Sequence, residues 1–337
     1  MDFTTGGRLE VRITPDDVGK RVSVRVLTGE REPAATFTDV VGVLTSWTEG
    51  TLAITRRTGE AVRIAESSLV AGKVVPAAPA RRRGPAANAP ELDRVAARGW
   101  PPVVGAQLGE WTLRASGGFT RRANSVLPLG DPGMDLDAAL RRVIEWYAAR
   151  ELPAYIQVST GAEGTQELLA AELESRGWTR EVSAQIRIAA LAPIADLDAD
   201  TSAVTLSRRL DDAWMARYQR SAEPSPEARA VLSGGPSVWF ATIAGEGGEA
   251  PAAIGRCVVD GRWAGFAAVE TAPERRRQGL AKAVMTALAR KALDEGASAA
   301  YLQVETDNGG ANALYEGMGF TVHHVYHHWR APREDVP

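Results

Sequence analysis

The chain contains a single cysteine, Cys257, among its 337 residues. One thiol excludes a disulfide framework and a cysteine-rich zinc site, and it fits a reducing compartment. No apolar run approaches the ~20 residues that a membrane-spanning helix requires. The opening residues, MDFTTGGRLE, lack the basic and apolar regions of a signal peptide. We therefore expect a cytoplasmic protein that has no membrane partner.

Basic residues are not in excess either. Lys and Arg number 39 against 42 Asp and Glu, which gives a formal net charge of −3. Because nucleic-acid-binding proteins usually carry a basic excess or stripe, the composition argues against a nucleic-acid partner. The composition, with 45% hydrophobic and 24% charged residues, is typical of a globular protein.

Residues 1–76 are predicted to form a small all-β barrel. Segments such as RVSVRVL and TLAITRR alternate apolar and polar residues, and turn sequences such as RTGE separate them. Alternation with a period of two at this spacing is typical of a small, strongly bent antiparallel barrel. Barrels of this kind serve many tasks, so the fold alone assigns no function to them.

Residues 77–95 are predicted to form a linker. The stretch VVPAAPARRRGPAANAPE is rich in Ala and Pro and has no periodicity, which indicates a semi-extended connector. Its basic run, Arg81–Arg83, is either a solvated part of the linker or a nucleic-acid contact, and we favour the first interpretation.

Two similar units are predicted after the linker, at residues 96–192 and 200–332. The first shows the order β-β-α-β-α-β, from the strand-like EWTLRAS and RRANSVLPL to the closing strand VSAQIRIA. The same order returns near the C-terminus. The second helix of each unit ends similarly, in LESRGW and YEGMGF, where Gly177 and Gly319 suit a left-handed position after the helix. An internal repeat is therefore our hypothesis.

The stretch PERRRQGLAKAVMTALARKALDEG, residues 273–296, places arginines and a glycine between a predicted buried strand and a helix. A helix start offers unpaired backbone N–H groups and the positive end of the helix dipole. Gly279 and Ala281 let a ligand approach that backbone closely. The combination predicts an anion site suited to phosphate oxygens, although it lacks the G-x-x-x-x-G-K-[ST] pattern of a P-loop.

Two motifs in the C-terminal unit resemble those of the GNAT N-acetyltransferase superfamily. Arg276-x-x-Gly279-x-Ala281 resembles the pyrophosphate-binding turn [QR]-x-x-G-x-[GA] of that family. One helix and one strand downstream, the family's second signature, N-x-x-A-x-x-L-Y-x-x-x-G-F, is matched at Asn308, Ala311, Leu314, Tyr315, Gly319 and Phe320. Together the motifs cover residues 200 to 330 well.

The resemblance implies an α/β (α+β) fold with a mixed central sheet whose two central parallel strands splay apart. Residues 200–332 would be the catalytic GNAT domain, and residues 96–192 a degenerate GNAT-like lobe. The first lobe has no pyrophosphate turn, and Leu173 stands where Tyr315 stands in the second. Tandem arrangements with one silent lobe occur in the superfamily, and the N-terminal barrel resembles the SH3-like barrels that precede some actinobacterial acetyltransferases.

The resemblance also implies acetyl-CoA as the donor substrate, and no metal. The strand at Val269 and Thr271 would bind the pantetheine arm through its backbone, with an N–H near Val269 polarising the acetyl carbonyl. The turn would hold the pyrophosphate. The expected cofactor-binding residues are Val269, Thr271, Arg276, Arg277, Gln278, Gly279, Leu280, Ala281, Lys282 and Asn308.

Two residues are predicted to be catalytic. Tyr315 matches the family's tyrosine, a weak acid that protonates or hydrogen-bonds the departing CoA sulfur. Glu270 is the candidate base for the attacking amine, although strand alternation places it opposite Val269 and Thr271. Glu305 and Asp307 are rival carboxylates, and the sequence does not decide between the three.

All four histidines lie in HHVYHHW, within a predicted strand. His323 and His324 should point to opposite faces, and His323 and His327 should lie ~13 Å apart. We therefore expect no metal site, although one histidine could still accept a proton from the amine. Cys257 is interpreted as a small buried apolar residue rather than a nucleophile.

The silent lobe is predicted to wall the acceptor pocket. In GGFTRRANSV, Arg121 or Arg122 and Asn124 would face that pocket from a strand and bind a carboxylate or carbonyl group. A small-molecule amine is the expected acceptor, attacked directly in a ternary complex without a covalent enzyme intermediate. A protein lysine or N-terminus is the alternative acceptor, and a non-catalytic acetyl-CoA binder is the competing function.

Overall fold

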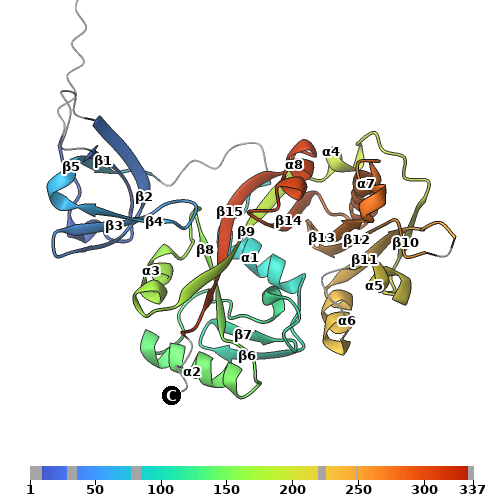
Figure 1. Cartoon of the computed structure of the whole chain (residues 1–337), viewed down its shortest axis with the longest axis horizontal. Helices are drawn as coiled ribbons and strands as arrows, with labels where there is room; N and C mark the ends of the chain where they lie inside the picture. The colour runs from blue at the N-terminus through green and yellow to red at the C-terminus, as the bar shows by residue number, and fades with distance from the viewer. Residues whose placement is uncertain (1–9, 29–35, 77–84, 219–224, 248, 333–337) are drawn as a thin grey trace, which may run out of the picture.

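The structure is a computed structural model that describes residues 10–28, 36–76, 85–218, 225–247 and 249–332. A five-stranded sheet lies at one end of the molecule, and an eight-stranded mixed sheet with helices runs through the remainder (Figure 1). This architecture confirms the expected mixed α/β fold with a separate N-terminal β sheet. The expected basic run at Arg81–Arg83 lies outside the described residues.

The N-terminal sheet is antiparallel, in the order β4-β3-β2-β1-β5. Its core contains Val22, Val24 and Val26, which alternate along the first strand as the sequence pattern requires, and Leu52 and Ile54 from the third. The strands are β1 (Arg21–Thr28), β2 (Thr36–Thr48), β3 (Thr51–Thr55), β4 (Ala61–Ala65) and β5 (Leu69–Val74).

The large sheet has the order β10-β11-β12-β13-β14-β9-β15-β8. All neighbouring strands are antiparallel except β13 and β14, which are parallel. The strands are β8 (Tyr155–Thr160), β9 (Thr179–Ala190), β10 (Val204–Ser207), β11 (Ser237–Ile243), β12 (Ala253–Asp260), β13 (Trp263–Thr271), β14 (Ala299–Glu305) and β15 (Thr321–Arg330).

The two predicted units exchange their last strands. Strand β9, from the first unit, lies between β14 and β15 of the second, and β15 lies between β9 and β8 of the first. Neither strand pairs with the strand that precedes it in its own unit, and Figure 1 shows β9 and β15 running together through the middle of the molecule. Residues 96–192 and 200–332 therefore build one continuous sheet rather than two.

The helices lie on both sides of this sheet. The longest, α7, packs Val284, Met285 and Leu288 into the largest hydrophobic core, beside β11, β12 and β13. No helix in the described part of the chain is long and apolar enough to cross a membrane. The helices are α1 (Ala89–Arg98), α2 (Leu136–Ala148), α3 (Glu167–Ser175), α4 (Ala192–Ala195), α5 (Asp212–Arg217), α6 (Pro226–Ser233), α7 (Leu280–Asp294) and α8 (Gly309–Gly317).

Helix α1 corrects the linker prediction, which was wrong from residue 89 onward. The side chain of Asn88 caps the helix by accepting a hydrogen bond from the Glu91 amide at 2.8 Å. Leu92, Val95 and Ala96 are buried against β9 and β14. The alanines that suggested a linker are also the strongest helix formers, and an N-cap with one apolar face was enough to make this segment helical.

The stretch GGFTRRANSV is not the predicted strand. Arg121–Ala123 form a single 3-10 turn, and Val126 and Leu127 make only isolated bridges, to Ile156 of β8 and to Thr112 respectively. The neighbouring two-stranded sheet consists instead of β6 (Val104–Leu108) and β7 (Trp111–Ala115).

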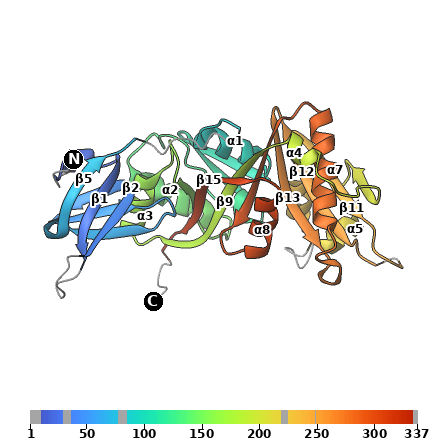
Figure 2. The same ribbon diagram turned by 90° about the horizontal axis from the view of Figure 1, so that it is seen from above.

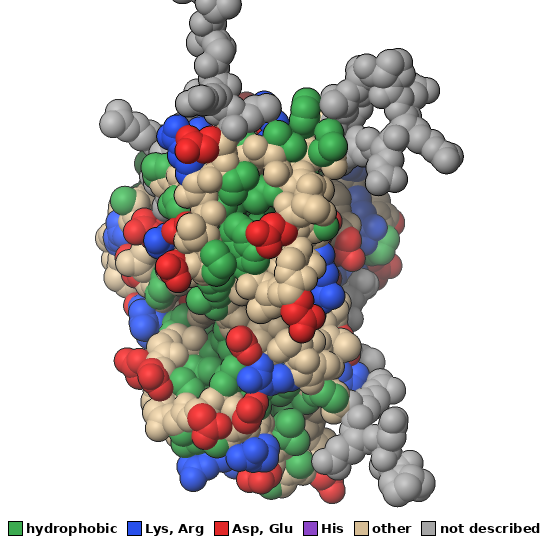
Figure 3. Space-filling model, turned by 90° about the vertical axis from the view of Figure 1, so that its left-hand side faces the viewer, with side chains coloured by type: hydrophobic (Ala, Val, Ile, Leu, Met, Phe, Trp, Pro, Cys, Tyr) green, Lys and Arg blue, Asp and Glu red, His purple; other side chains and the backbone are tan. Residues whose placement is uncertain are grey.

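The N-terminal sheet contacts the exchanged strands through its β3–β4 hairpin. Arg57 donates a hydrogen bond to the carbonyl of Val322 at 3.2 Å, and Arg180 donates to the carbonyl of Gly59 at 2.9 Å. Figure 2 shows this sheet at one end of an elongated molecule and α7 toward the other. Its end face exposes hydrophobic side chains among charged ones (Figure 3), and Leu27 and Phe37 are among the exposed apolar residues of this sheet.

Candidate active site

The parallel strands β13 and β14 separate halfway along their length. They pair only between Trp263–Phe266 and Ala299–Leu302, although β13 continues to Thr271. At the point of separation Ala268 has φ +50°, and the register with β12 shifts. A non-glycine residue in the left-handed region is uncommon and marks local strain. Beyond this point the β14-facing edge of β13 offers backbone groups that β14 does not pair, so the strands splay as the family resemblance implied.

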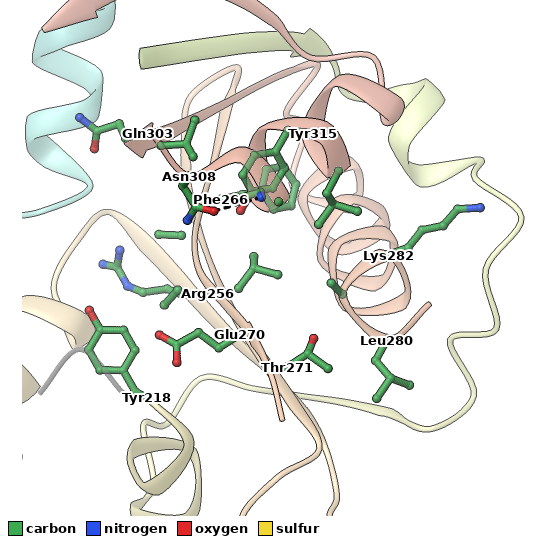
Figure 4. A pocket seen from close by; sticks show the side chains of 18 of the residues that line it. Tyr218, Arg256, Phe266, Glu270, Thr271, Leu280, Lys282, Gln303, Asn308 and Tyr315 are labelled. Atoms are coloured by element: carbon green, nitrogen blue, oxygen red, sulfur yellow. Dashed lines mark hydrogen bonds between the residues drawn. The ribbon is translucent and has the colours of Figure 1, made fainter. Parts of the chain in front are cut away.

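This wedge opens into a cavity of about 820 Å³ (Figure 4). The cavity is lined by the end of β13, the start of α7, one side of α8, and Gly99 and Trp100 at the end of α1. Of the predicted cofactor-binding residues, Gln278 is the one that does not line it, because its side-chain oxygen accepts a hydrogen bond from Arg275 at 3.0 Å. The cavity brings together the other predicted site residues, namely Val269, Thr271, Arg276, Arg277, Gly279, Leu280, Ala281, Lys282, Asn308, Glu270 and Tyr315.

The N-terminus of α7 carries no capping side chain. Gly279 stands at the N-cap with φ +82°, and a β-carbon added there would meet no atom within 4 Å. The first-turn amides therefore face open space, which fits a diphosphate group at a helix N-terminus. The equivalent helix of the first unit, α2, begins differently, because the Asp135 carboxylate already accepts from the Ala138 amide at 2.9 Å.

The basic residues of this turn differ in how they are held. Lys282 donates to the carbonyl of Asp198 at 2.7 Å, and Arg275 pairs with Glu246 at 2.8 Å. Arg276 and Arg277 line the cavity, and their side chains make no hydrogen bond or ion pair to any residue that the structure describes. Their charge is therefore available to an anion in front of the helix.

Tyr315 lies on α8, across the wedge from β13 (Figure 4). Its ring packs against Phe320, with ring centroids 6.0 Å apart. The helix is fixed at both ends, since Asn308 caps its start by accepting from the Ala311 amide at 3.1 Å, and Gly319 with φ +89° ends it. Asn308 thus positions the helix of Tyr315 as well as lining the cavity.

Glu270 lies at the end of the cavity away from the helix turn. Figure 4 shows it on the same side as Tyr218 and Arg256, with Leu280 and Lys282 at the opposite end. Val269, Glu270 and Thr271 all line the cavity where β13 is unpaired on one side. Val269 packs against the core beside α7, and Glu270 lies toward Tyr218, so the expectation that the two side chains face opposite sides stays a prediction that this arrangement fits. Of its predicted rivals, Asp307 does not line this cavity, and neither does Glu305.

Comparisons with known proteins agree with this geometry. A family model described as "Probable histone acetyltransferase Rv0428c C-terminal" matches residues 86–329. The chain belongs to this family. It is 30% identical over 319 residues to the protein named probable histone acetyltransferase Rv0428c of Mycobacterium tuberculosis, covering 91% of this chain and 93% of that protein. It is 28% identical over 257 residues to the uncharacterized N-acetyltransferase YobR of Bacillus subtilis, covering 72% and 98% respectively.

A solved structure supports the same fold. A GCN5-related N-acetyltransferase from Kribbella flavida has a TM-score of 0.55 and 17% sequence identity, covering 74% of this chain and 97% of that one. Together the relatives and the fold confirm the predicted GNAT resemblance, and the protein is an acetyltransferase of GNAT type.

A second cavity of about 400 Å³ adjoins the first in this acetyltransferase, and Arg122 and Tyr218 line both. Its walls come from both units. The full lining is Phe119, Thr120, Arg121, Arg122, Val182, Ala184, Tyr218, Glu305, Tyr326 and His328. A wall from the first unit was predicted from the sequence, but the contributions of β9 and β15 depend on the strand exchange.

The predicted role of Asn124 in acceptor binding is contradicted. Its side-chain oxygen accepts from the amides of Ser116 and Gly118, and its NH₂ group donates to the carbonyls of Phe119 and Thr120. All four hydrogen-bonding positions of this buried amide are used within its own loop. Asn124 therefore shapes the loop and has no capacity left for a ligand.

The other candidate of that loop, Arg121, lines only the second cavity. Its guanidinium pairs with Glu181 at 2.9 Å and lies 5.0 Å from the centroid of the Tyr155 ring. Arg122, the alternative to Arg121, has the better position because it lines both cavities. Its Nε donates to the Tyr326 hydroxyl at 3.0 Å.

The histidines do not form a metal site. His323 and His324 do not point apart as predicted, because the register with β9 shifts between Val322 and His324 and brings their Nδ1 atoms within 2.7 Å of each other. His324 also contacts Asp93 at 3.1 Å. Within the described ranges, no three His, Cys, Asp or Glu side chains are grouped to hold a metal ion.

Cys257 is buried, and it does not line either cavity. Burial raises the pKa of its thiol to about 12. A thiol that stays protonated at neutral pH is a poor nucleophile.

Proposed function

We propose that the protein transfers the acetyl group of acetyl-CoA to the primary amine of a small molecule, by direct attack in a ternary complex. The observation that carries this proposal is the shared lining of one cavity. The uncapped start of α7, the unpaired edge of β13 and Tyr315 all border it. These are a diphosphate site, a peptide-like hydrogen-bonding edge and a weak acid, in the order in which a coenzyme thioester needs them.

Donor binding would use backbone groups more than side chains. The first-turn amides of α7 and the two arginines without described partners, Arg276 and Arg277, would hold the diphosphate. The edge of β13 beyond Phe266 would pair with the amides of the pantetheine arm. An N–H near Val269 would stabilise the negative charge that develops on the acetyl oxygen, which is typically worth about 3 kcal/mol for one such donor.

Glu270 would take a proton from the substrate ammonium, and the amine nitrogen would then form a bond to the acetyl carbon as the carbon–sulfur bond breaks. Tyr315 would donate its proton to the departing sulfur. The nitrogen would lose its second proton as the amide forms, and that proton would restore Tyr315 by way of solvent, while Glu270 would release its proton to solvent. No step needs a nucleophile of the protein, which agrees with the buried position of Cys257.

A second acceptor class has support from one observation. A relative that is 30% identical is named a probable histone acetyltransferase, so a lysine side chain of a protein is the alternative acceptor. The positive charges at the Glu270 end of the first cavity and in the second cavity favour a small molecule over a basic segment of a protein. Arg256, Arg121 and Arg122 line the two cavities, and burial lowers the pKa of Arg256 only to about 10, so it stays cationic at neutral pH.

The proposal is tested by thiol release from acetyl-CoA over a panel of amines and a lysine peptide, together with calorimetry of CoA binding. Tyr315→Phe should lower kcat about a hundredfold while CoA affinity stays close to that of the wild type. Tyr147→Phe is the matched control, because that hydroxyl donates to the Arg114 carbonyl and lines neither cavity. Tight CoA binding without turnover of any acceptor would instead identify a non-catalytic binder.

A further inference from the structure

His328 has no hydrogen-bond partner for either ring nitrogen among the described residues, although its side chain is only 3% exposed. It lies on β15 and lines the second cavity. A buried polar group without a partner costs about 1–3 kcal/mol, and native proteins rarely retain one without a reason. The unpaired ring is therefore a candidate hydrogen-bonding group for a ligand of the cavity.

The surroundings of His328 keep its ring neutral. Burial is the largest cause that holds its pKa well below the usual range, and the charges of Arg122, Arg114 and Arg121 act in the same direction. Tyr155 and Tyr326 pack edge-on against the ring, with centroids 6.5 and 5.6 Å away. Glu305 is the carboxylate that lines the same cavity. A neutral imidazole offers one N–H donor and one acceptor nitrogen.

Of the three arginines, Arg122 is the one that lines both cavities. Arg114 is bonded to Ser125 and Gln157. Arg121 is ion-paired with Glu181, although its buried Nε has no partner among the described residues. Arg122 uses its Nε on Tyr326, while its two terminal nitrogens bond to nothing in the described part of the chain. Its guanidinium also lies over the Trp100 ring, 5.5 Å from the centroid. A guanidinium held at Nε presents a fork suited to a carboxylate.

We propose that the second cavity binds the acceptor and that the acceptor is a primary amine that also carries a carboxylate. Arg122 binds the carboxylate at the junction of the two cavities, and the N–H of His328 donates to the same group. The amine extends past Tyr218 toward Glu270 in the first cavity. A volume of about 400 Å³ falls in the small-ligand range of roughly 300–1,000 Å³. This inference rests on the acetyl transfer proposed above.

The experiment compares amino acids with the amines that lack their carboxylate. The probes are L-lysine with cadaverine, L-phenylalanine with phenethylamine, and a lysine peptide with blocked termini. A carboxylate held by a charged pair should raise kcat/KM about tenfold or more over the matched amine. In Arg122→Gln this ratio should collapse toward one, mainly through KM, and Arg122→Lys should restore part of it. Arg142→Gln, an exposed arginine on α2, is the control.

The role of His328 is read separately by nitrogen NMR of the histidine rings. The chain has four histidines, so the resonances missing from His328→Gln assign this ring. Adding the best carboxylated probe together with CoA should shift the His328 signals and leave those of His323 in place. His328→Leu should raise KM for that probe, and His328→Gln, which keeps a donor and an acceptor, should restore it.

The failures are distinguishable. Equal kcat/KM for both members of each pair, preference for the peptide, or unchanged His328 signals would overturn the carboxylate inference and leave acetyl transfer intact. Thiol release with none of the probes, despite CoA binding, would overturn both proposals.

Discussion

Buried histidines make this fold less stable at mildly acidic pH, and the size of the effect can be calculated for His327. Its ring lies between the hydroxyls of Ser183, at 2.8 Å, and Thr160, at 3.1 Å. Burial, followed by the charge of Arg180, lowers its pKa from 6.5 to about 3. The folded protein therefore holds this ring neutral across the range in which the unfolded chain takes up a proton.

The direction follows from proton binding. Above pH 6.5 neither state protonates His327, and the full stability is present. Between pH 6.5 and about 3 only the unfolded chain binds the proton, so stability falls as the pH falls. The slope is about 1.4 kcal/mol per pH unit, which gives a loss of about 2 kcal/mol from this residue between pH 7 and pH 5. His323 and His328 have pKa values shifted in the same direction and add to the loss.

The assay is urea unfolding at pH 7 and at pH 5, for the wild type and for His327→Gln. A glutamine amide can hydrogen-bond to both hydroxyls but does not titrate. The decrease in unfolding free energy between the two pH values should be about 2 kcal/mol smaller in the variant, whatever its stability at pH 7. Equal decreases in both proteins would refute the reasoning, because carboxylates titrate identically in the two.

Two further predictions concern glycines, each with a matched control. Gly279→Ala should weaken CoA binding about tenfold by calorimetry, because its methyl group would enter the space before the α7 amides, whereas Gly296→Ala, at φ +90° with equally open surroundings, should lower only stability. Gly59→Ala should lower the unfolding free energy by about 1–3 kcal/mol, since the added carbon would lie 2.2 Å from His327 Nε2. Gly50→Ala, at φ +72° with nothing within 4 Å, measures the cost of the backbone angle alone. If both variants lost the same unfolding free energy, the clash with His327 would contribute nothing.

The geometry of the proposed donor site could be predicted from the sequence because its determinants are local. A strand, a glycine with a left-handed φ and a helix follow one another directly, so the position of Gly279 fixes where the first-turn amides lie. The same holds for Tyr315, which Asn308 and Gly319 place on a short capped helix. Such features need only a few neighbouring residues to be recognised.

The geometry of the proposed acceptor site could not be predicted in the same way, because it is non-local. The alternation in β15 is the same whether its neighbour is β14 or β9, so nothing in the sequence of His323–His328 reveals the exchange. The prediction of a strand at GGFTRRANSV was wrong because the side chain of Asn124 accepts hydrogen bonds from backbone amides and so stabilises a tight loop instead. Trp100 was missed as a wall residue because the segment before it was interpreted as a linker.

The strand exchange gives a physical reason why the first unit is retained beside the second. Strand β14, which forms one side of the wedge, has β9 of the first unit as its other neighbour over its whole length, from Ala299 to Glu305. Without β9 that edge would be exposed, and exposed strand edges invite aggregation. The same lobe supplies Val182 and Ala184 to the second cavity, and Arg122 to the junction of the two. The first unit is therefore part of the proposed active site of the second, and the shared sheet requires the two units to fold together.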